Sequence, residues 1–118
     1  MDRKKGEVRK MTSKWMDIAK KALEPADKVH QNYIAWYNDQ NGYVVLSNRK
    51  LLFVSEKGLF KKSYDLVLEV PYDKIDEIIR NGNALTLIEE EKRHIFKTGY
   101  ASAIERSIKH LKESTIMA

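Results

Sequence analysis

The sequence predicts a mainly β fold of the α+β class, in which a small antiparallel barrel or sandwich is closed by one C-terminal helix. The first observation is the stretch GYVVLSNRKLLFV, residues 42–54. Its two apolar runs, 43–46 and 51–54, flank the polar break 47–50, as the strands of a hairpin flank their turn. The second is that more strand-like runs follow, and the third is a final amphipathic helix. This order of elements favours a scaffold for binding over one for catalysis.

Composition limits the class of protein. A chain of 118 residues is the size of one domain, which can bury a core without cross-links. It has no cysteine, which excludes disulfides, thiolate zinc sites and cysteine nucleophiles, and we expect a cytoplasmic protein. No apolar run approaches the roughly 20 residues that span a bilayer. The charged start MDRKKGEVRK does not have the pattern of a secretory signal.

The net charge of +5 is concentrated near the N-terminus. Residues 1–28 hold nine lysines and arginines against five acidic residues, whereas the rest of the chain is nearly balanced. A basic arm of this kind favours anionic lipid or nucleic acid, but it is also typical of the solvated face of an ordinary helix.

Residues 7–24 are expected to form an N-terminal helix. Its apolar face combines side chains at helical spacing: Val8, Met11, Trp15, Ile18 and Ala22. Pro25 ends the helix because the residue before a proline is displaced from the α region. We therefore treat residues 1–24 as a basic amphipathic helix that packs on the barrel, on a partner subunit or on a membrane.

Seven short strands are predicted after Pro25. Residues 29–37 are rich in aromatic side chains, and residues 63–70 alternate apolar and polar positions. Asn81 and Gly82 form a strong hairpin-turn signal because both tolerate a positive φ. The predicted strands are 29–37, 43–46, 51–54, 63–70, 74–80, 84–88 and 94–97.

A capping helix is predicted after Thr98, which serves as its N-cap. The apolar stripe of this helix is formed by Tyr100, Ile104, Ile108 and Leu111. We expect the barrel and its capping helix to occupy residues 25–113, and residues 114–118 to form a frayed tail.

Three segments resemble bacterial-type pleckstrin-homology (PH) domains and the related GRAM domains. Residues 23–29, LEPADKV, are similar to the opening of these domains, where a leucine precedes an acidic turn and the first strand. Residues 46–53, LSNRKLLF, resemble their Thr/Ser-Asn-x-Arg/Lys turn between two apolar strands. Residues 70–75, VPYDKI, resemble the start of their fifth strand. The similarity extends over residues 23–112.

The resemblance implies a PH-like, seven-stranded, partly open antiparallel barrel with one end closed by the C-terminal helix. It also implies a module for binding or assembly rather than an enzyme. The chain departs from the phosphoinositide-binding members, because the loop 38–42 has no basic residue to hold a phosphorylated head group. A preference for phosphoinositides is therefore not expected.

The sequence offers no constellation for catalysis or for binding a metal or cofactor. His30, His94 and His110 belong to three different predicted elements and lack the spacing of metal ligands. The three glutamates at 89–91 occupy a turn, where consecutive side chains diverge and do not form an acid–base pair. The serines lack the strand–turn–helix setting of a nucleophile elbow. We expect no enzyme and no cofactor.

Two basic turns are the candidates for binding an anionic surface. The first hairpin turn and the following connection both carry cations, and the second also carries Leu59 and Phe60. The cations are Arg49, Lys50, Lys57, Lys61 and Lys62. If both turns opened at one end of the barrel, they would flank an exposed apolar pair, as in peripheral membrane proteins. The alternative is that Leu59 and Phe60 simply cap the barrel.

We expect the protein to be a non-catalytic interaction module that self-associates or binds a protein partner. Five apolar side chains are the candidates for this contact: Met11, Trp15, Ile18, Leu59 and Phe60. The alternative is a cytoplasmic protein peripheral to the membrane, which binds anionic lipid through its basic loops and N-terminal helix. Nucleic acid is a weaker candidate because aromatic and basic residues do not interleave, and no small-molecule substrate is inferred.

Overall fold

The computed structural model describes residues 13–117 of the chain. Met11, one of the predicted partner contacts, therefore lies outside the described residues. The elements in this range are, in chain order, α2 (Lys14–Lys21), β1 (Val29–Tyr37), β2 (Gln40–Ser47), β3 (Lys50–Lys57), β4 (Ser63–Pro71), the 3₁₀ turn η1 (Tyr72–Lys74), β5 (Ile75–Asn81), β6 (Ala84–Glu89), β7 (Lys92–Lys97) and α3 (Ala101–Met117).

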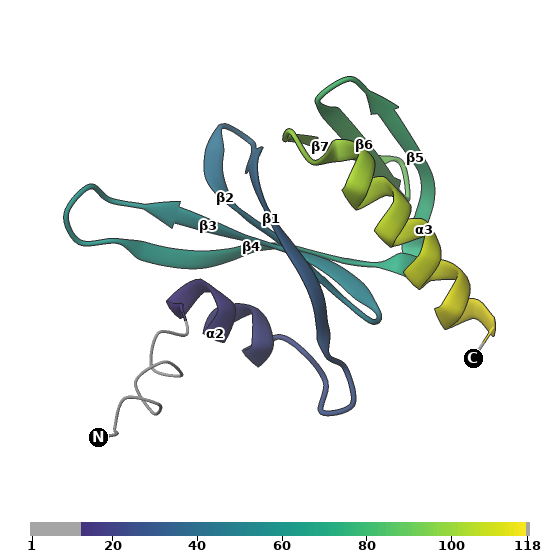
Figure 1. Cartoon of the computed structure of the whole chain (residues 1–118), viewed down its shortest axis with the longest axis horizontal. Coiled ribbons are helices and arrows are strands. Elements are labelled where there is room, and N and C mark those ends of the chain that lie inside the picture. Colours follow the sequence, from purple (N-terminus) through teal and green to yellow (C-terminus); the bar gives the residue numbers. More distant parts are fainter. Residues whose placement is uncertain (1–12, 118) are drawn as a thin grey trace.

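The seven strands form one antiparallel sheet in the order β4-β3-β2-β1-β7-β6-β5. The sheet bends between β1 and β7, where two positions pair, Trp36 with Lys97 and Tyr37 with Phe96. β4 and β5 are the two edges of the sheet, so the barrel is open, with α3 on one side and α2 on the other (Figure 1). The predicted mainly β fold, with seven antiparallel strands in an open arrangement and a helix at each end of the chain, is confirmed.

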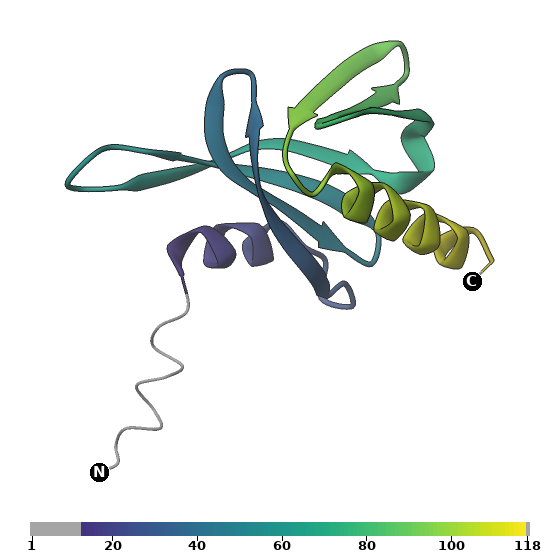
Figure 2. The ribbon, with the colours of Figure 1, turned by 45° about the horizontal axis from the view of Figure 1, so that its top comes forward.

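The inner face of the sheet and α3 enclose the main core. α3 lies across one end of the barrel (Figure 2) and buries Ile104, Ile108 and Leu111. On the facing strands, the ring of Phe53 lies over Gly42, where a Cβ atom would come within 2.8 Å of the ring and 2.2 Å of the Val54 carbonyl oxygen. Close contact between ring and backbone therefore requires glycine at position 42.

The start of α3 differs slightly from the prediction. Tyr100, expected in the buried stripe, is half exposed and packs against the ring of Tyr33. The Thr98 hydroxyl oxygen accepts a hydrogen bond from the Tyr100 N–H (3.0 Å) and donates one to the Ile34 carbonyl (2.9 Å), so it ties the start of the helix to β1. At the other end, α3 continues to Met117, beyond the predicted end at residue 113.

The outer face of β2, β3 and β4 is covered by α2. Ala19 is fully buried there against Val45, Leu52 and Val54 in a second, smaller core. Because both faces of β3 are covered, its residues 51–55 are all buried, which explains the continuous apolar run in the sequence. Of the three packing partners that the sequence left open for this helix, the chain's own sheet is the one found.

Residues 7–12 of the predicted helix lie outside the described residues, and the described part, α2, ends earlier than the predicted end at residue 24. It begins at Lys14 after the N-cap Ser13 and ends with Ala22 as the C-cap, three residues before Pro25. The Asp27 N–H then donates to the Glu24 carbonyl (2.9 Å), which forms the turn into β1. The apolar stripe continues past the helix, since Leu23 packs on the same outer core.

A buried polar cluster joins α2, β1 and the β2–β3 turn at the end of the barrel that α3 closes. The Asp27 carboxylate accepts hydrogen bonds from the Ser47 hydroxyl (2.8 Å) and from the backbone N–H groups of Lys28 and Asn48 (both 2.9 Å). Asp27 and Ser47 are buried, and each would be costly to bury without these partners. The carboxylate thus fixes the β2–β3 turn against the start of β1.

Tyr72 of η1 completes this joint, which we call the corner cluster (Asp27, Ser47, Asn48 and Tyr72). Its hydroxyl donates to the Ser47 carbonyl (2.8 Å), and its N–H donates to the Arg49 carbonyl (2.9 Å). Each of the three segments that resemble PH and GRAM domains contributes to the corner cluster. The residues that carry the resemblance therefore hold the fold together at one place.

Candidate functional site

The connection between β3 and β4 carries the most exposed apolar side chains of the described chain. Leu59 is 88% exposed and Phe60 is 100% exposed. Lys57 precedes them, and Lys61 and Lys62 follow, all on the surface. We call residues 57–62 the hairpin tip. The β3–β4 hairpin projects from the rest of the sheet as an arm, and the hairpin tip is its end (Figures 1 and 2).

Gly58 gives the hairpin tip its shape. Its φ of +100° lies in the region that only glycine adopts without strain, and a Cβ atom there would lie 2.3 Å from the Lys61 carbonyl oxygen. The backbone therefore reverses tightly at Gly58, and Leu59 and Phe60 remain almost fully exposed to solvent. The alternative that they cap the barrel is wrong, because the hairpin extends past the barrel.

A chain of polar contacts anchors the base of the hairpin tip. Lys62 Nζ lies 2.7 Å from one Glu56 carboxylate oxygen, and the Tyr43 hydroxyl donates to the other (3.0 Å). The bond from Lys62 holds the pKa of the Glu56 carboxyl below its ordinary value, and burial raises the pKa of the Tyr43 hydroxyl. The Tyr43 ring stacks on Trp15, with centroids 4.0 Å apart. The first turn of α2 therefore lies beside the base of the hairpin.

The structure separates the five cations that the sequence grouped. Lys50 pairs with Pro71 at one end of β3, and Lys57 pairs with Ser63 at the other. Successive turns of an antiparallel meander must lie at opposite ends of the shared strand, so Arg49 and Lys50 cannot join the hairpin tip. The expectation of one five-cation surface is wrong in its geometry, and Lys57, Lys61 and Lys62 are the cations that remain beside Leu59 and Phe60.

Lys50 has a structural contact instead. Its Nζ donates to the Ala22 carbonyl at the end of α2 (2.8 Å) and to the Glu69 carboxylate (3.0 Å), and its side chain is only 15% exposed. A cation at a helix C-terminus stabilises the orphan carbonyls there. Lys50 therefore fastens α2 to β3 and β4.

Two of the predicted partner contacts are likewise used within the chain. Trp15 and Ile18 pack on the outer core formed by Val45, Leu52 and Val54. Their apolar surface faces the sheet of the same molecule, and their role as partner contacts stays a prediction. Leu59 and Phe60 remain exposed.

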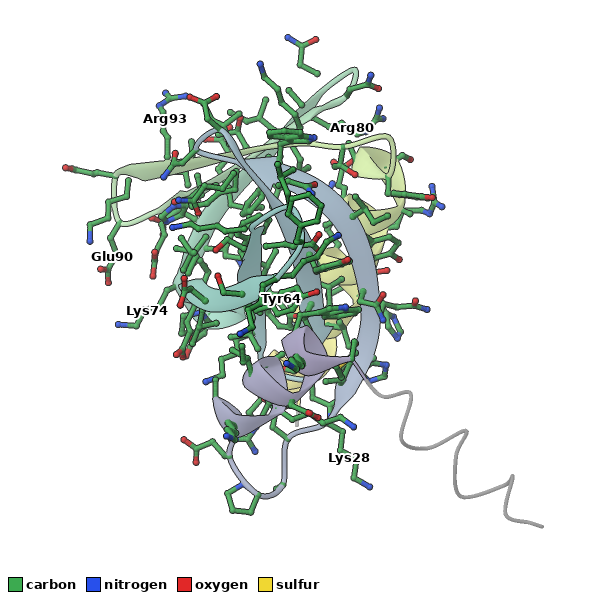
Figure 3. The ribbon with its side chains drawn as sticks, turned by 90° about the vertical axis from the view of Figure 1, so that its left-hand side faces the viewer. Lys28, Tyr64, Lys74, Arg80, Glu90 and Arg93 are labelled. Atoms are coloured by element: carbon green, nitrogen blue, oxygen red, sulfur yellow. The ribbon has the colours of Figure 1, made fainter. Side chains whose placement is uncertain are left out.

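The β1–β2 turn, at the same end of β2 and β3 as the hairpin tip, is not basic, and the acidic β6–β7 turn lies beside η1 instead. Asn38 and Asp39 form the β1–β2 turn, and Glu90 and Glu91 form the β6–β7 turn, all with positive φ. Lys74 Nζ lies 3.8 Å from a carboxylate oxygen of Glu90, and both residues are labelled in Figure 3. In the same view the labelled Lys28, Arg80 and Arg93 point in different directions and form no common patch. The cationic character at this end thus belongs to the hairpin tip.

A hydrogen-bonded trio that sequence spacing did not indicate lies inside the barrel. The buried Tyr37 hydroxyl lies 3.1 Å from His94 Nδ1, and His94 Nε2 lies 2.9 Å from the Glu89 carboxylate. Burial raises the pKa of Tyr37. Phe53 and Phe96 pack around the Tyr37 ring, so the trio fills the interior rather than facing a ligand. Alternation along β6 and β7 would have placed these side chains inward, but only the fold makes them neighbours.

Sequence reasoning also missed an exposed apolar patch on the outer face of β1 and β7. Ile34 is 58% exposed, Trp36 is 52% exposed and Ile95 is 48% exposed. We call these three residues the outer-face patch. The positions 34 and 36 share one face of a strand, which is a signal available in the sequence. The sequence did not indicate which part of the outer face of the sheet α2 would leave uncovered.

Two classes of site find no support in the part of the chain that the structure describes. Among residues 13–117, no three histidine or acidic side chains come together as metal ligands. Within the same residues, neither helix combines the length and the apolar character needed to cross a bilayer.

Comparison with known proteins gives a fold relationship. No family model matches the chain, and no curated protein matches it. A similar solved structure is the crystal structure of the C-terminal domain of an unknown protein from Leishmania infantum. The TM-score is 0.61 at 14% sequence identity, over 92% of this chain and 96% of that chain. At this identity the similarity shows the shared fold alone.

Proposed function

We propose that this protein is a non-catalytic module that binds anionic membrane surfaces through the hairpin tip. The observation that carries the proposal is a fully exposed Phe60, beside an almost fully exposed Leu59, at the end of a projecting arm with lysines on both sides. An isolated exposed leucine needs no explanation, but an apolar pair held away from the core by a glycine turn is suited to insertion into the interface of a bilayer.

The expected affinity is modest. Each lysine near an anionic surface contributes about 1 kcal/mol, and full burial of a leucine or phenylalanine contributes about 2 kcal/mol. Lys62 contributes less than the others because it is paired with Glu56. Such a sum supports reversible attachment, which weakens at high salt because screening reduces the lysine contribution.

The N-terminal segment contributes further positive charge to the protein. Residues 1–12 hold five lysines and arginines and two acidic residues, and they join the described chain at Ser13. The first turn of α2 lies beside Tyr43, which is bonded to Glu56 at the base of the hairpin tip. The first described turn of α2 therefore lies nearer to the hairpin tip than to the corner cluster.

We expect no preference for polyphosphorylated inositol lipids. Such head groups are held by several cations that converge from neighbouring loops. Here the β1–β2 turn carries Asp39 and no basic residue, and its negative charge disfavours a compact polyanion. Binding should follow the surface charge of the membrane.

Vesicle sedimentation at low salt tests the proposal. The full chain should sediment with vesicles of phosphatidylcholine and phosphatidylserine and remain in solution with phosphatidylcholine alone. A Leu59→Ser/Phe60→Ser variant should bind about tenfold more weakly, which corresponds to about 1.4 kcal/mol. A Lys57→Glu/Lys61→Glu variant should lose the dependence on phosphatidylserine.

Matched controls use the same chemistry elsewhere on the surface. Ile34→Ser/Ile95→Ser removes two exposed apolar side chains from the outer-face patch, and Lys92→Glu/Arg93→Glu reverses two charges near the β6–β7 turn. Both should bind vesicles like the original chain. If the tip variants bind as well as the controls do, the proposal is wrong.

A second candidate function is self-association through the outer-face patch. α2 covers the outer face over β2, β3 and β4, whereas Ile34, Trp36 and Ile95 on β1 and β7 remain uncovered. Sedimentation-velocity centrifugation over a range of concentrations tests it. A dimer that Trp36→Ser dissociates supports this function, and a monomer at every concentration contradicts it.

A further inference from the structure

A hollow of about 670 Å³ lies at the opposite end of β3 from the hairpin tip. We call it the corner hollow. Its walls come from the start of β1, the β2–β3 turn, the β4–η1 corner and the last turns of α3. Its volume is in the range of sites that hold small molecules. The charged and imidazole side chains that line it are His30, Arg49, Asp73 and His110.

The fold brings together here two histidines that the sequence left scattered. His30 is on β1, and His110 is on α3, eighty positions further along the chain. His30 lies at the irregularity of β1, because Val29 pairs with Ser47 whereas Gln31 pairs with the adjacent Leu46. A bulge of this kind redirects a side chain away from the regular alternation of the strand.

Arg49 is held at the hollow by its backbone. Its N–H donates to the Ser47 hydroxyl oxygen (3.2 Å), and its carbonyl accepts from the Tyr72 N–H (2.9 Å). Both partners belong to the corner cluster, which is buried and fixed by Asp27. The guanidinium therefore extends from a rigid turn, which reduces the entropy lost when it binds a ligand.

The charged side chains around the hollow have no partners in the described chain. Lys50, Lys62, Arg80, Lys109 and Lys112 each bind an acidic side chain or a carbonyl. In contrast, the side chains of His30, Arg49, Asp73 and His110 form no hydrogen bond or ion pair with another of residues 13–117. Their binding capacity is thus available to a ligand.

We propose that the corner hollow binds a small phosphate ester that carries hydroxyl groups, such as a phosphorylated polyol. Arg49 is the principal phosphate ligand because its guanidinium can form two parallel hydrogen bonds to phosphate oxygens. His30 and His110 donate from their ring N–H groups. Asp73 is the reason why the ligand should also carry hydroxyl groups. Its carboxylate repels a bare anion and accepts hydrogen bonds from hydroxyl groups.

The position of the hollow favours a soluble ester over a lipid head group. β3 has eight residues, Lys50–Lys57, so Arg49 lies roughly 25 Å from the hairpin tip at about 3.3 Å per residue. A membrane that receives Phe60 is therefore distant from Arg49. The inference goes beyond the proposed membrane function and does not depend on it.

Imidazole NMR signals provide a direct test, because the chain has three histidines and the third is an internal control. His94 is buried and bonded to Tyr37 and Glu89, so its signals should not respond. Titration of the full chain with glycerol 3-phosphate, at constant ionic strength, should shift the His30 and His110 signals together along one saturable curve. Glycerol alone should shift none of them.

Two variants identify the phosphate ligand. Arg49→Met keeps the backbone contacts of the turn and removes the guanidinium, and it should weaken glycerol 3-phosphate binding at least about tenfold, or 1.4 kcal/mol. Arg93→Met removes an exposed guanidinium that does not line the hollow, and it should leave the affinity unchanged. Unchanged amide spectra away from the turn verify that both variants are folded. Equal affinities of the two variants would overturn the proposal, as would linear, unsaturated shifts.

A third variant tests the role of Asp73. The original chain should bind glycerol 3-phosphate more tightly than inorganic phosphate, and Asp73→Asn should bind inorganic phosphate more tightly than the original chain does. Equal affinity of the original chain for both anions would overturn the polyol class. Phosphatidylglycerol vesicles distinguish a soluble ester from a lipid head group as the ligand. When they are added to the Leu59→Ser/Phe60→Ser variant, we expect no shift of the His30 and His110 signals. A shift as large as that with glycerol 3-phosphate would assign the hollow to lipid instead.

Discussion

The two ends of β3 differ in how their polar and apolar groups are used. At the Lys50 end, Asp27, Ser47 and Tyr72 are buried and joined by hydrogen bonds between 2.8 and 2.9 Å. At the Lys57 end, the side chains of Leu59 and Phe60 are almost fully exposed to solvent and do not belong to either hydrophobic core. The first end is where the fold is held together, and the second is a surface that the fold presents.

The difference shows why motif strength and functional location need not coincide. The three segments with the most recognisable pattern, residues 23–29, 46–53 and 70–75, meet at the corner cluster. Their polar residues form hydrogen bonds to the backbone of the turns that meet there. The residues of the hairpin tip do not have to bond buried backbone groups, so their composition can be determined by what they contact outside the protein.

Removal of the Asp27 carboxylate should have the largest effect on stability. Asp27→Ala removes the two hydrogen bonds that the buried carboxylate accepts from the Ser47 hydroxyl and the Asn48 N–H. Such losses cost about 1–3 kcal/mol each, so we expect the free energy of unfolding to fall by about 3 kcal/mol. Urea denaturation measures it. The control Asp65→Ala, at an exposed position of β4, should change the free energy of unfolding by less than about 0.5 kcal/mol. Equal effects of the two variants would contradict the structural role assigned to the corner cluster.

Truncation of Trp15 should have the next largest effect. Trp15→Ala removes the ring that stacks on Tyr43 and packs on the outer core, which should lower the free energy of unfolding by about 2 kcal/mol. Thermal unfolding monitored by circular dichroism measures this. If Trp15 instead served a partner subunit, the variant would keep its stability and change its oligomeric state.

The Tyr72 hydroxyl should have a smaller effect that depends on pH. Tyr72→Phe loses the bond to the Ser47 carbonyl, worth about 1.5 kcal/mol at neutral pH. Burial raises the pKa of the Tyr72 hydroxyl far above its ordinary value, so the folded protein keeps this proton when the unfolded chain loses it. A raised pKa stabilises the fold below the unfolded-state pKa of about 10, and this stabilisation is lost as the pH rises further.

The comparison of Tyr72→Phe with the original chain should therefore change with pH. Urea midpoints at pH 7 should favour the original chain, and the difference should shrink above pH 10, because only the original chain has Tyr72 to ionise on unfolding. A difference that stays constant from pH 7 to pH 11 would contradict the assignment. The comparison extends above pH 10 because tyrosine in unfolded chains ionises at a pH of about 10 and above.

The hairpin tip should give the smallest effect on stability. Leu59→Ser/Phe60→Ser replaces two side chains that are exposed in the folded protein and in the unfolded chain alike. The free energy of unfolding should change by less than about 0.5 kcal/mol, while vesicle binding falls. A loss of more than about 2 kcal/mol would indicate that the hairpin tip packs on the barrel after all.

Much of the fold could be predicted from the sequence because local signals specify it. Apolar runs, aromatic content and, in residues 63–70, alternation identified the seven strands. The Asn81–Gly82 turn identified a hairpin, and the spacing of Ile104, Ile108 and Leu111 identified the capping helix. These signals act over a few residues, through backbone preference and burial of one face. The docking of Trp15 on the sheet was one of three outcomes that helical periodicity allows equally.

The candidate site was only half predictable. Leu59, Phe60 and the flanking lysines are adjacent in sequence, so their grouping needs no tertiary information. Arg49 was grouped with them because both turns are basic, but the direction of each strand decides at which end a turn lies.

By itself, the sequence determined the strands, the two helical faces and the composition of the hairpin tip, because each depends on neighbours along the chain. Tertiary structure alone decided that α2 covers its own sheet, that Tyr37, His94 and Glu89 meet inside the barrel, and that His30 and His110 share a hollow with Arg49. Those contacts join elements up to eighty residues apart, and the curvature of the sheet, which no local pattern encodes, brings them together.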